Sequence, residues 1–208
     1  MPFVFYDLET SGLSPEFDQL LQFAAVKTDD QFNDVDSFRL RCRLAPHIVP
    51  SPEALLVNRT SPSMLTDPDL PTHYEASRKI RVKFLDSSPA TFIGYNSIGF
   101  DEDFLRQGFF QTLQPVYLTN TKGNSRGDLL KFVHATAIYA PGALTIPTNE
   151  NGDPVYRLDQ LAPAISLCDT HNAMKMGLIY DESSPRRTQA VHPSAGLRRT
   201  HPLEFKFE

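Results

Sequence analysis

The stretch Phe3-Val-Phe-Tyr-Asp-Leu-Glu-Thr-Ser-Gly-Leu13 decides how this chain is organised. Residues Phe3 to Leu8 are dense in aromatic and branched side chains, which predicts a buried first strand. Because residues two apart in a strand face the same side, Asp7 and Glu9 project together. Two like charges at the edge of an apolar sheet repel each other and are poorly solvated, and a hard divalent cation with oxygen ligands is the simplest group to offset this. The alternative is that both acids lie past the strand end, in solvent.

Two further segments carry residues suited to catalysis. A predicted strand at residues 91–95 leads through Asn96 into a helix with an acidic first turn. We expect Asp101 to lie with the strand acids, and Asp103 to cap the helix or face solvent. An alternative explains the segment equally well: the acids of this first turn only cap the helix and complement its dipole. His171, on a short helical stretch, is a candidate general base, but a surface or capping role is commoner for such a histidine.

The remaining pattern predicts an α/β fold with a mixed sheet. Residues 20–27 form a second apolar run and residues 38–44 alternate strictly, so both are expected to join the first strand in an antiparallel meander. The alternation sets two groups of side chains on opposite faces: Phe38, Leu40, Cys42 and Leu44 against Arg39, Arg41 and Arg43. Helices and short strands then alternate, which favours additional strands and helices on the faces of the sheet. Helices are predicted from Ser51 and at residues 72–85, 100–113, 129–139 and 158–167, and strands at 91–95 and 115–118.

Composition restricts the class of protein. The 208 residues are 40% hydrophobic and 22% charged, which is typical of a globular domain, and no apolar stretch is long enough to span a membrane. The net charge of −5 argues against nucleic-acid binding, except that metal ions held by carboxylates reverse the local field. The two isolated cysteines, Cys42 and Cys168, fit a reducing cytoplasm rather than a zinc site. Residues 1–176 are predicted to form the domain, and the Arg-rich residues 177–208 an irregular tail, disordered or out of frame.

Together these segments resemble the DEDDh exonuclease superfamily, which has an RNase H-like fold. Its pattern is Asp-x-Glu on the first strand, then Asn-x-x-x-Phe-Asp, then His followed five positions later by Asp. Asp7 with Glu9 matches the first element, and Asn96, Phe100 and Asp101 match the second. Other segments are similar to bacterial exodeoxyribonuclease I, among them Asp18-Gln-Leu-Leu-Gln-Phe-Ala-Ala, Gly94-Tyr-Asn-Ser, Ala140-Pro-Gly-Ala-Leu-Thr-Ile-Pro and Leu158-Asp-Gln-Leu-Ala-Pro-Ala.

The resemblance implies a 3′→5′ exonuclease that releases 5′-mononucleotides from single-stranded DNA. It implies two Mg²⁺ ions, replaceable by Mn²⁺, with Asp7 bridging them, Glu9 binding one, Asp101 supporting the second and His171 acting as general base. A single-stranded-DNA-binding protein and further DNA-gripping domains belong to the full-length family. The residues expected to bind substrate are Thr10, Asn96, Phe100, Lys122 and Arg126, although a solvated loop explains the last two equally well.

The third element of the pattern is incomplete. Met176 stands where the family has Asp, and a thioether does not replace a carboxylate as a Mg²⁺ ligand. Asp169 and Asp181 are not placed to substitute. One added G before the codons for Lys175 and Met176 gives Glu-Asp, which suggests a frameshift. Sequencing the locus again would reject this hypothesis if the Met176 codon is confirmed and no open frame continues.

Two interpretations from different classes therefore stay open. The first is an exonuclease domain impaired by the loss of one metal ligand. The second is a weak or catalytically dead nucleic-acid-binding remnant of such an enzyme. A proofreading subunit or a small-oligoribonucleotide exonuclease shares the superfamily, but the exodeoxyribonuclease I-like segments disfavour both.

Overall fold

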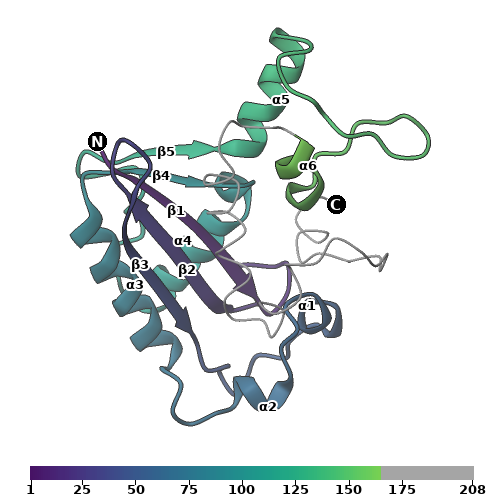
Figure 1. Ribbon diagram of the computed structural model, residues 1–208. Helices are drawn as coiled ribbons and strands as arrows, with labels where there is room; N and C mark the ends of the chain where they lie inside the picture. Colours follow the sequence, from purple (N-terminus) through teal and green to yellow (C-terminus); the bar gives the residue numbers. More distant parts are fainter. Residues whose placement is uncertain (165–208) are drawn as a thin grey trace. The chain divides into compact units, whose positions relative to one another are not determined.

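The computed structural model describes residues 1–164, and their arrangement can be followed in Figure 1. A five-stranded sheet has the order β3-β2-β1-β4-β5. β1 (Phe3–Thr10), β2 (Leu20–Thr28) and β3 (Asp34–Arg41) form an antiparallel meander, whereas β4 (Thr91–Gly94) and β5 (Ser125–Asp128) run parallel to β1. The predicted mixed sheet, an antiparallel meander extended by parallel strands, is thereby confirmed.

Two of the helices begin at capping residues close to the starts that the sequence predicts. The side chain of Ser51 accepts a hydrogen bond from the N–H of Ala54 at 3.1 Å, and Thr72 forms a capping box with Glu75. The helical elements are α1 (Pro52–Val57), α2 (Pro62–Leu65), α3 (His73–Ser87), the 3-10 turn η1 (Ser97–Gly99), α4 (Asp101–Gln111), α5 (Leu129–Tyr139) and α6 (Leu158–Ala164).

The chain divides into two compact units, the first of which is Met1–Lys131 and contains the whole sheet with α1 to α4. The second begins at Phe132, and within it the rings of His134 and Tyr156 meet edge-on with their centroids 4.2 Å apart. The predicted domain end at residue 176 and the tail that follows lie outside the described residues, so this boundary stays a prediction.

One face of the sheet carries the core of the first unit, and α3 and α4 cover it (Figure 1). Alternate residues of β1 point into this core, namely Val4, Tyr6 and Leu8. The Tyr6 ring meets that of Phe84 edge-on, with 6.0 Å between centroids. Burial of each large apolar side chain contributes about 1.5–3 kcal/mol to stability. Because side chains alternate along a strand, Asp7 and Glu9 face away from this core.

Two strand predictions differ from the structure. The predicted strand at residues 115–118 is wrong, because Pro115 has no N–H for a ladder and the chain loops back, with Asn124 Nδ2 donating to the Leu118 carbonyl at 2.7 Å. The last strand of the sheet is instead β5, ten residues further on. The third strand ends at Arg41 rather than at residue 44, because the N–H of Arg43 donates to the carbonyl of Pro71 and the chain leaves the sheet.

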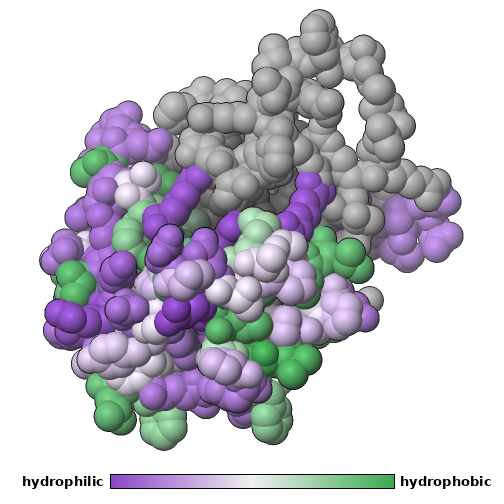
Figure 2. All heavy atoms as spheres, turned by 90° about the horizontal axis from the view of Figure 1, so that it is seen from below, coloured by the Kyte–Doolittle hydropathy of each residue, from purple (hydrophilic) through white to green (hydrophobic). Residues whose placement is uncertain are grey.

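The described surface mixes polar and apolar side chains. Figure 2 views the molecule from the α2 end and shows hydrophobic and hydrophilic residues interspersed over that face. Within residues 1–164, none of the helices combines the length and the apolar character needed to cross a bilayer.

Candidate active site

The two strand acids and Asp101 all lie near the carboxyl-terminal end of β1. β4 pairs with β1 only as far as Phe5, and beyond that point the first residue of α4 occupies the edge of β1. Asp101 Oδ1 accepts the backbone N–H of Leu8 at 3.1 Å. Leu8 lies between Asp7 and Glu9, so a carboxylate from 93 residues away stands beside both. Asp101 and Asp7 are 1% and 5% exposed, and Glu9 is half-buried.

The turn that presents Asp101 is held by a residue that the sequence analysis does not single out. Asp128, at the end of β5, accepts the N–H of Asn96 at 3.0 Å and that of Ile98 at 3.2 Å. Its carboxylate also accepts the N–H of Leu130 at 3.1 Å, at the start of α5. The missed signal was an aspartate directly before an apolar helix, a common capping position. Asp128 thus ties the β4–α4 turn to the end of β5.

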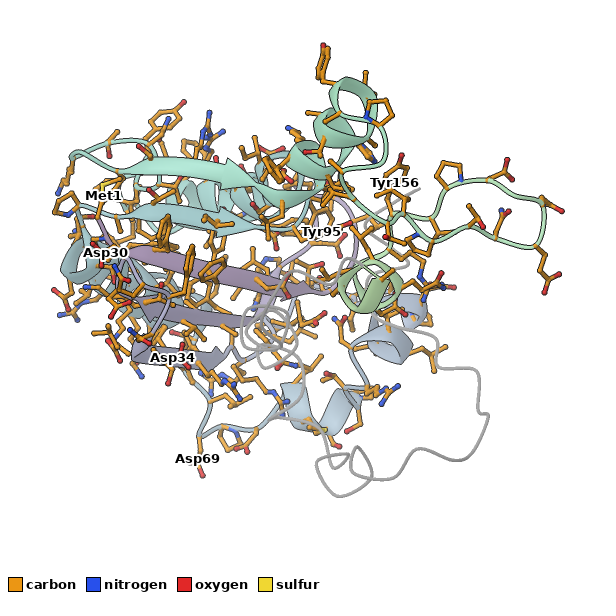
Figure 3. All side chains as sticks on the ribbon, turned by 45° about the horizontal axis from the view of Figure 1, so that its top comes forward. Met1, Asp30, Asp34, Asp69, Tyr95 and Tyr156 are labelled. Atoms are coloured by element: carbon orange, nitrogen blue, oxygen red, sulfur yellow. The ribbon has the colours of Figure 1, made fainter. Side chains whose placement is uncertain are left out.

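The backbone of this turn leaves little freedom. A Cβ atom on Gly94 would lie 2.4 Å from the Cβ of Ser97, so only glycine fits at the end of β4. Asn96 has φ of 60°, in the left-handed region that Asn tolerates better than most residues. Figure 3 marks this end of the sheet with Tyr95, whereas Met1 and Asp30 lie at the opposite end.

Glu102 anchors α4 from the other side. It is 1% exposed, forms ion pairs with Arg106 and Arg126, and accepts the hydroxyl of Thr119 at 2.9 Å. Arg126, a predicted phosphate contact, is therefore held by Glu102, and its side chain is one-third exposed. Lys122, the second predicted contact, is exposed in the loop before β5.

Two of the other three predicted substrate contacts, Thr10 and Phe100, are engaged within the protein. The hydroxyl of Thr10 donates to the carbonyl of Gly12 at 2.7 Å, which shapes the loop after β1. The ring of Phe100 packs against that of Phe104 with 5.1 Å between centroids, next to the start of α4. Thr10, Asn96 and Phe100 thus border the acids, and Arg126 lies on β5 beside Glu102. Lys122 precedes β5 and therefore lies beside the start of β4, at the other end of the parallel strands from the acids.

The electrostatics reflect this concentration of acids. Burial first, and then the charges of Asp101 and Glu102, raise the pKa of Tyr6 well above its usual value. The hydroxyl of Ser97 lowers this pKa, and the charge of Asp128 adds a smaller rise. Tyr6 is therefore protonated at neutral pH, and negative charge gathers on the helix side of β1.

The donor chemistry at this position suits a hard cation. Asp7, Glu9 and Asp101 supply carboxylate oxygens, which Mg²⁺ and Mn²⁺ prefer. Within residues 1–164, no three Asp, Glu, His or Cys side chains are already gathered closely enough to hold a metal ion. The predicted base His171 and the position of Met176 lie outside the described residues.

A sheet of this order, with acids on its first strand and a third after its fourth, defines the RNase H-like class of nuclease folds. The family model described as exonuclease matches residues 4–175, and the chain belongs to this family. Exonucleases of this type are metal-dependent. The chain is 33% identical to exodeoxyribonuclease I of Escherichia coli over 177 residues, which is 83% of this chain and 37% of that protein.

Solved structures agree with this similarity. E. coli exonuclease I in complex with a dT13 oligonucleotide matches with a TM-score of 0.74 and 29% identity, over 86% of this chain and 39% of that one. An ExoI/SSB-Ct complex matches with a TM-score of 0.74 and 27% identity, over 86% and 41%. The resemblance to exodeoxyribonuclease I is confirmed, although the chain spans less than half the length of the curated relatives it matches.

Proposed function

We propose that this chain is the nuclease domain, residues 1–176, of a 3′→5′ exonuclease that removes 5′-mononucleotides from single-stranded DNA. The observation that carries the proposal is the hydrogen bond from the Leu8 N–H to Asp101 Oδ1, which holds Asp101 beside the strand segment that bears Asp7 and Glu9. Membership of the exonuclease family supports phosphodiester hydrolysis. The oligonucleotide bound by a relative supports single-stranded DNA as the substrate.

Asp7, Glu9 and Asp101 are the proposed ligands of two Mg²⁺ ions, for which Mn²⁺ can substitute. When bound, such ions supply positive charge at the scissile phosphate and at the leaving oxygen. Asp7 and Glu9 face one side of β1, and Asp101 is oriented by the backbone of Leu8. Because Asp101 is fixed on one oxygen, rotation of the Asp7 and Glu9 side chains would complete the ligand set.

His171 is the proposed general base, which takes a proton from the attacking water. Histidine titrates near neutral pH, so this role needs little adjustment by the protein. Thr10, Asn96 and Phe100 would line the site around the terminal nucleotide. Arg126 would contact a phosphate while paired to Glu102, as its one-third exposed side chain allows. Lys122, in the loop before β5, would contact a phosphate further from the acids.

We further propose a cytoplasmic location and a partner of the single-stranded-DNA-binding type. The isolated cysteines support the first, since Cys42 is buried as a free thiol. The SSB-Ct complex of a relative supports the second.

The test is release of nucleotide from a single strand labelled at its 3′ end, with Mg²⁺ or Mn²⁺. Asp7→Asn should lower the rate about 100-fold or more, because a lost metal ligand removes several kcal/mol of transition-state stabilisation. Asp30→Asn removes the same charge from the opposite end of the sheet and should leave the rate unchanged. Release that survives a chelator, or that persists in Asp7→Asn, contradicts the proposal.

A second function, a DNA-binding remnant without turnover, is favoured by Met176 at the position where the family has Asp. Binding of the strand without release would support it. If the exonuclease assignment is right, Met176→Asp should raise the rate by orders of magnitude, about 100-fold or more, because it restores an oxygen ligand. Met174→Asp, two residues away, should give no such gain.

A further inference from the structure

The register of the meander brings two arginines onto the sheet face that carries the strand acids. In an antiparallel ladder, residues directly opposite each other project from the same face. The pairing of β1 with β2 and of β2 with β3 produces two rows: Asp7, Ala24, Arg39 and Glu9, Gln22, Arg41. Each arginine is thus two strand spacings, about 10 Å between Cα atoms, from an acid of the proposed site.

Packing fixes the direction of both arginines. Phe38 and Leu40, their neighbours on β3, pack against the core on the opposite face. Arg39 is exposed and Arg41 is half-buried, so both reach the surface. In the strand between them and the acids, Ala24 has no side chain long enough to intervene, and Gln22 presents an amide. Between the acids and the arginines, the β2 positions of these two rows therefore carry only one short apolar side chain and one neutral amide.

The opposite side of β1 is already occupied. There the edge of the strand is taken by Asp101 and by the turn that Asp128 holds. An exonuclease that holds a 3′ end at the acids has to lead the rest of the strand away in the 5′ direction. Among the described elements, β3 places exposed positive charge on the same sheet face as the strand acids.

The chemistry of these side chains suits a polyanion. Guanidinium groups match phosphate oxygens with paired N–H donors. The chain has a net charge of −5, but the two arginines put positive charge on this face of the sheet. We propose that Arg39 and Arg41 bind phosphates of the DNA strand on the 5′ side of the scissile bond, a few nucleotides away. This phosphate-binding strip rests on the proposed exonuclease function.

The test uses the full chain and an oligothymidylate with a fluorophore at its 5′ end. The double variant Arg39→Gln with Arg41→Gln should raise KM about tenfold and leave kcat within about threefold. The slope of log affinity against log salt should become shallower by about 1.4, because each lost contact to a single strand removes about 0.7. Arg39→Lys with Arg41→Lys keeps the charge and should retain most of the slope.

The matched control is a double variant that removes two positive charges elsewhere, Arg78→Gln with Lys79→Gln on the exposed face of α3. It lowers the net charge equally and should leave KM and the salt slope unchanged. An oligonucleotide too short to extend from the acids to β3 should be cleaved alike by wild type and by the Arg39 and Arg41 variant.

The outcomes separate this inference from the proposed function. If wild type releases nucleotide but the double variant keeps KM and salt slope, the strip is overturned and the exonuclease stands. If the variant instead loses kcat and needs more metal at an unchanged slope, the arginines neutralise the acids and the strip is also overturned. If wild type binds without cleaving, the exonuclease fails and the salt slope alone decides on the strip. A double Gln variant that does not fold is replaced by each single Gln variant, with an expected slope change of about 0.7.

Discussion

Under the proposed function Asp101 has two separable tasks: one oxygen accepts the Leu8 N–H, and the carboxylate charge is the proposed partner of a cation. Asp101→Asn keeps a carbonyl oxygen for Leu8 and loses the charge. We expect it to change the free energy of unfolding by less than about 1 kcal/mol while lowering nucleotide release about 100-fold. Asp101→Ala should lose the same activity and also destabilise the fold by about 1–3 kcal/mol, since the buried N–H is left without an acceptor.

Urea unfolding and the release assay on both variants check this prediction. If Asp101→Asn keeps the wild-type rate, Asp101 holds the backbone and nothing else. If both variants unfold at the wild-type urea concentration, the bond to Leu8 contributes nothing to stability, and the placement of α4 needs another cause.

At the scale of elements, the sequence predicts the strands and helices that have long apolar runs or local capping signals. β1 and β2 hold long apolar runs, and the capped starts of α1 and α3 have sequence signals that act within four residues. β5 was missed because Ser-Arg-Gly-Asp has no apolar pattern, and it becomes a strand only by pairing with β4. The exact ends of β3 were missed because tertiary hydrogen bonds decide where the chain leaves the sheet.

The site divides in the same way. Asp7 and Glu9 were predictable from strand periodicity, because two residues of separation suffice to place both on one face. The contact between Asp101 and Leu8 joins residues 93 positions apart, and no local rule encodes it. The role of Asp128 depends on the parallel pairing of β4 with β5, which the sequence did not reveal. The metal and substrate roles of these residues stay predictions.

Asp128 joins three elements and is therefore the point at which their coupling can be tested. Asp128→Ala removes the acceptor for the N–H groups of Asn96, Ile98 and Leu130, and should cost about 2–4 kcal/mol of stability. Because the turn that carries Asp101 loosens, we expect kcat to fall at least about tenfold at a temperature where the variant is folded, since small misplacements of catalytic groups are costly.

Thr72→Ala is the matched control, since it removes the cap of α3 away from the acids. It should cost about 1 kcal/mol of stability and leave kcat unchanged. Circular dichroism confirms folding at the assay temperature. If Asp128→Ala loses stability but turns over like Thr72→Ala, the carboxylate is a helix cap and does not position Asp101.

At the scale of the whole molecule, stability should depend on pH through the junction of α3 and α4. His73, at the start of α3, approaches α4 so closely that a Cβ on Gly108 would lie 3.1 Å from its Nε2. Burial, and next the charge of His47, lower the pKa of His73. The unfolded chain has the ordinary value of about 6.5, so at lower pH it binds the proton more readily than the folded chain does.

The contribution of neutral His73 to the free energy of unfolding is therefore fully present above about pH 6.5. It is lost as the pH falls toward the lower pKa that His73 has in the folded state. Urea unfolding should therefore show a smaller free energy at about pH 5.5 than at about pH 7.5. His73→Asn should flatten this dependence, whatever it does to stability at neutral pH. His47→Asn should flatten it only in part, because the burial of His73 remains. An unchanged slope in His73→Asn would assign the acid sensitivity to other groups and leave the α3–α4 junction without a role in it.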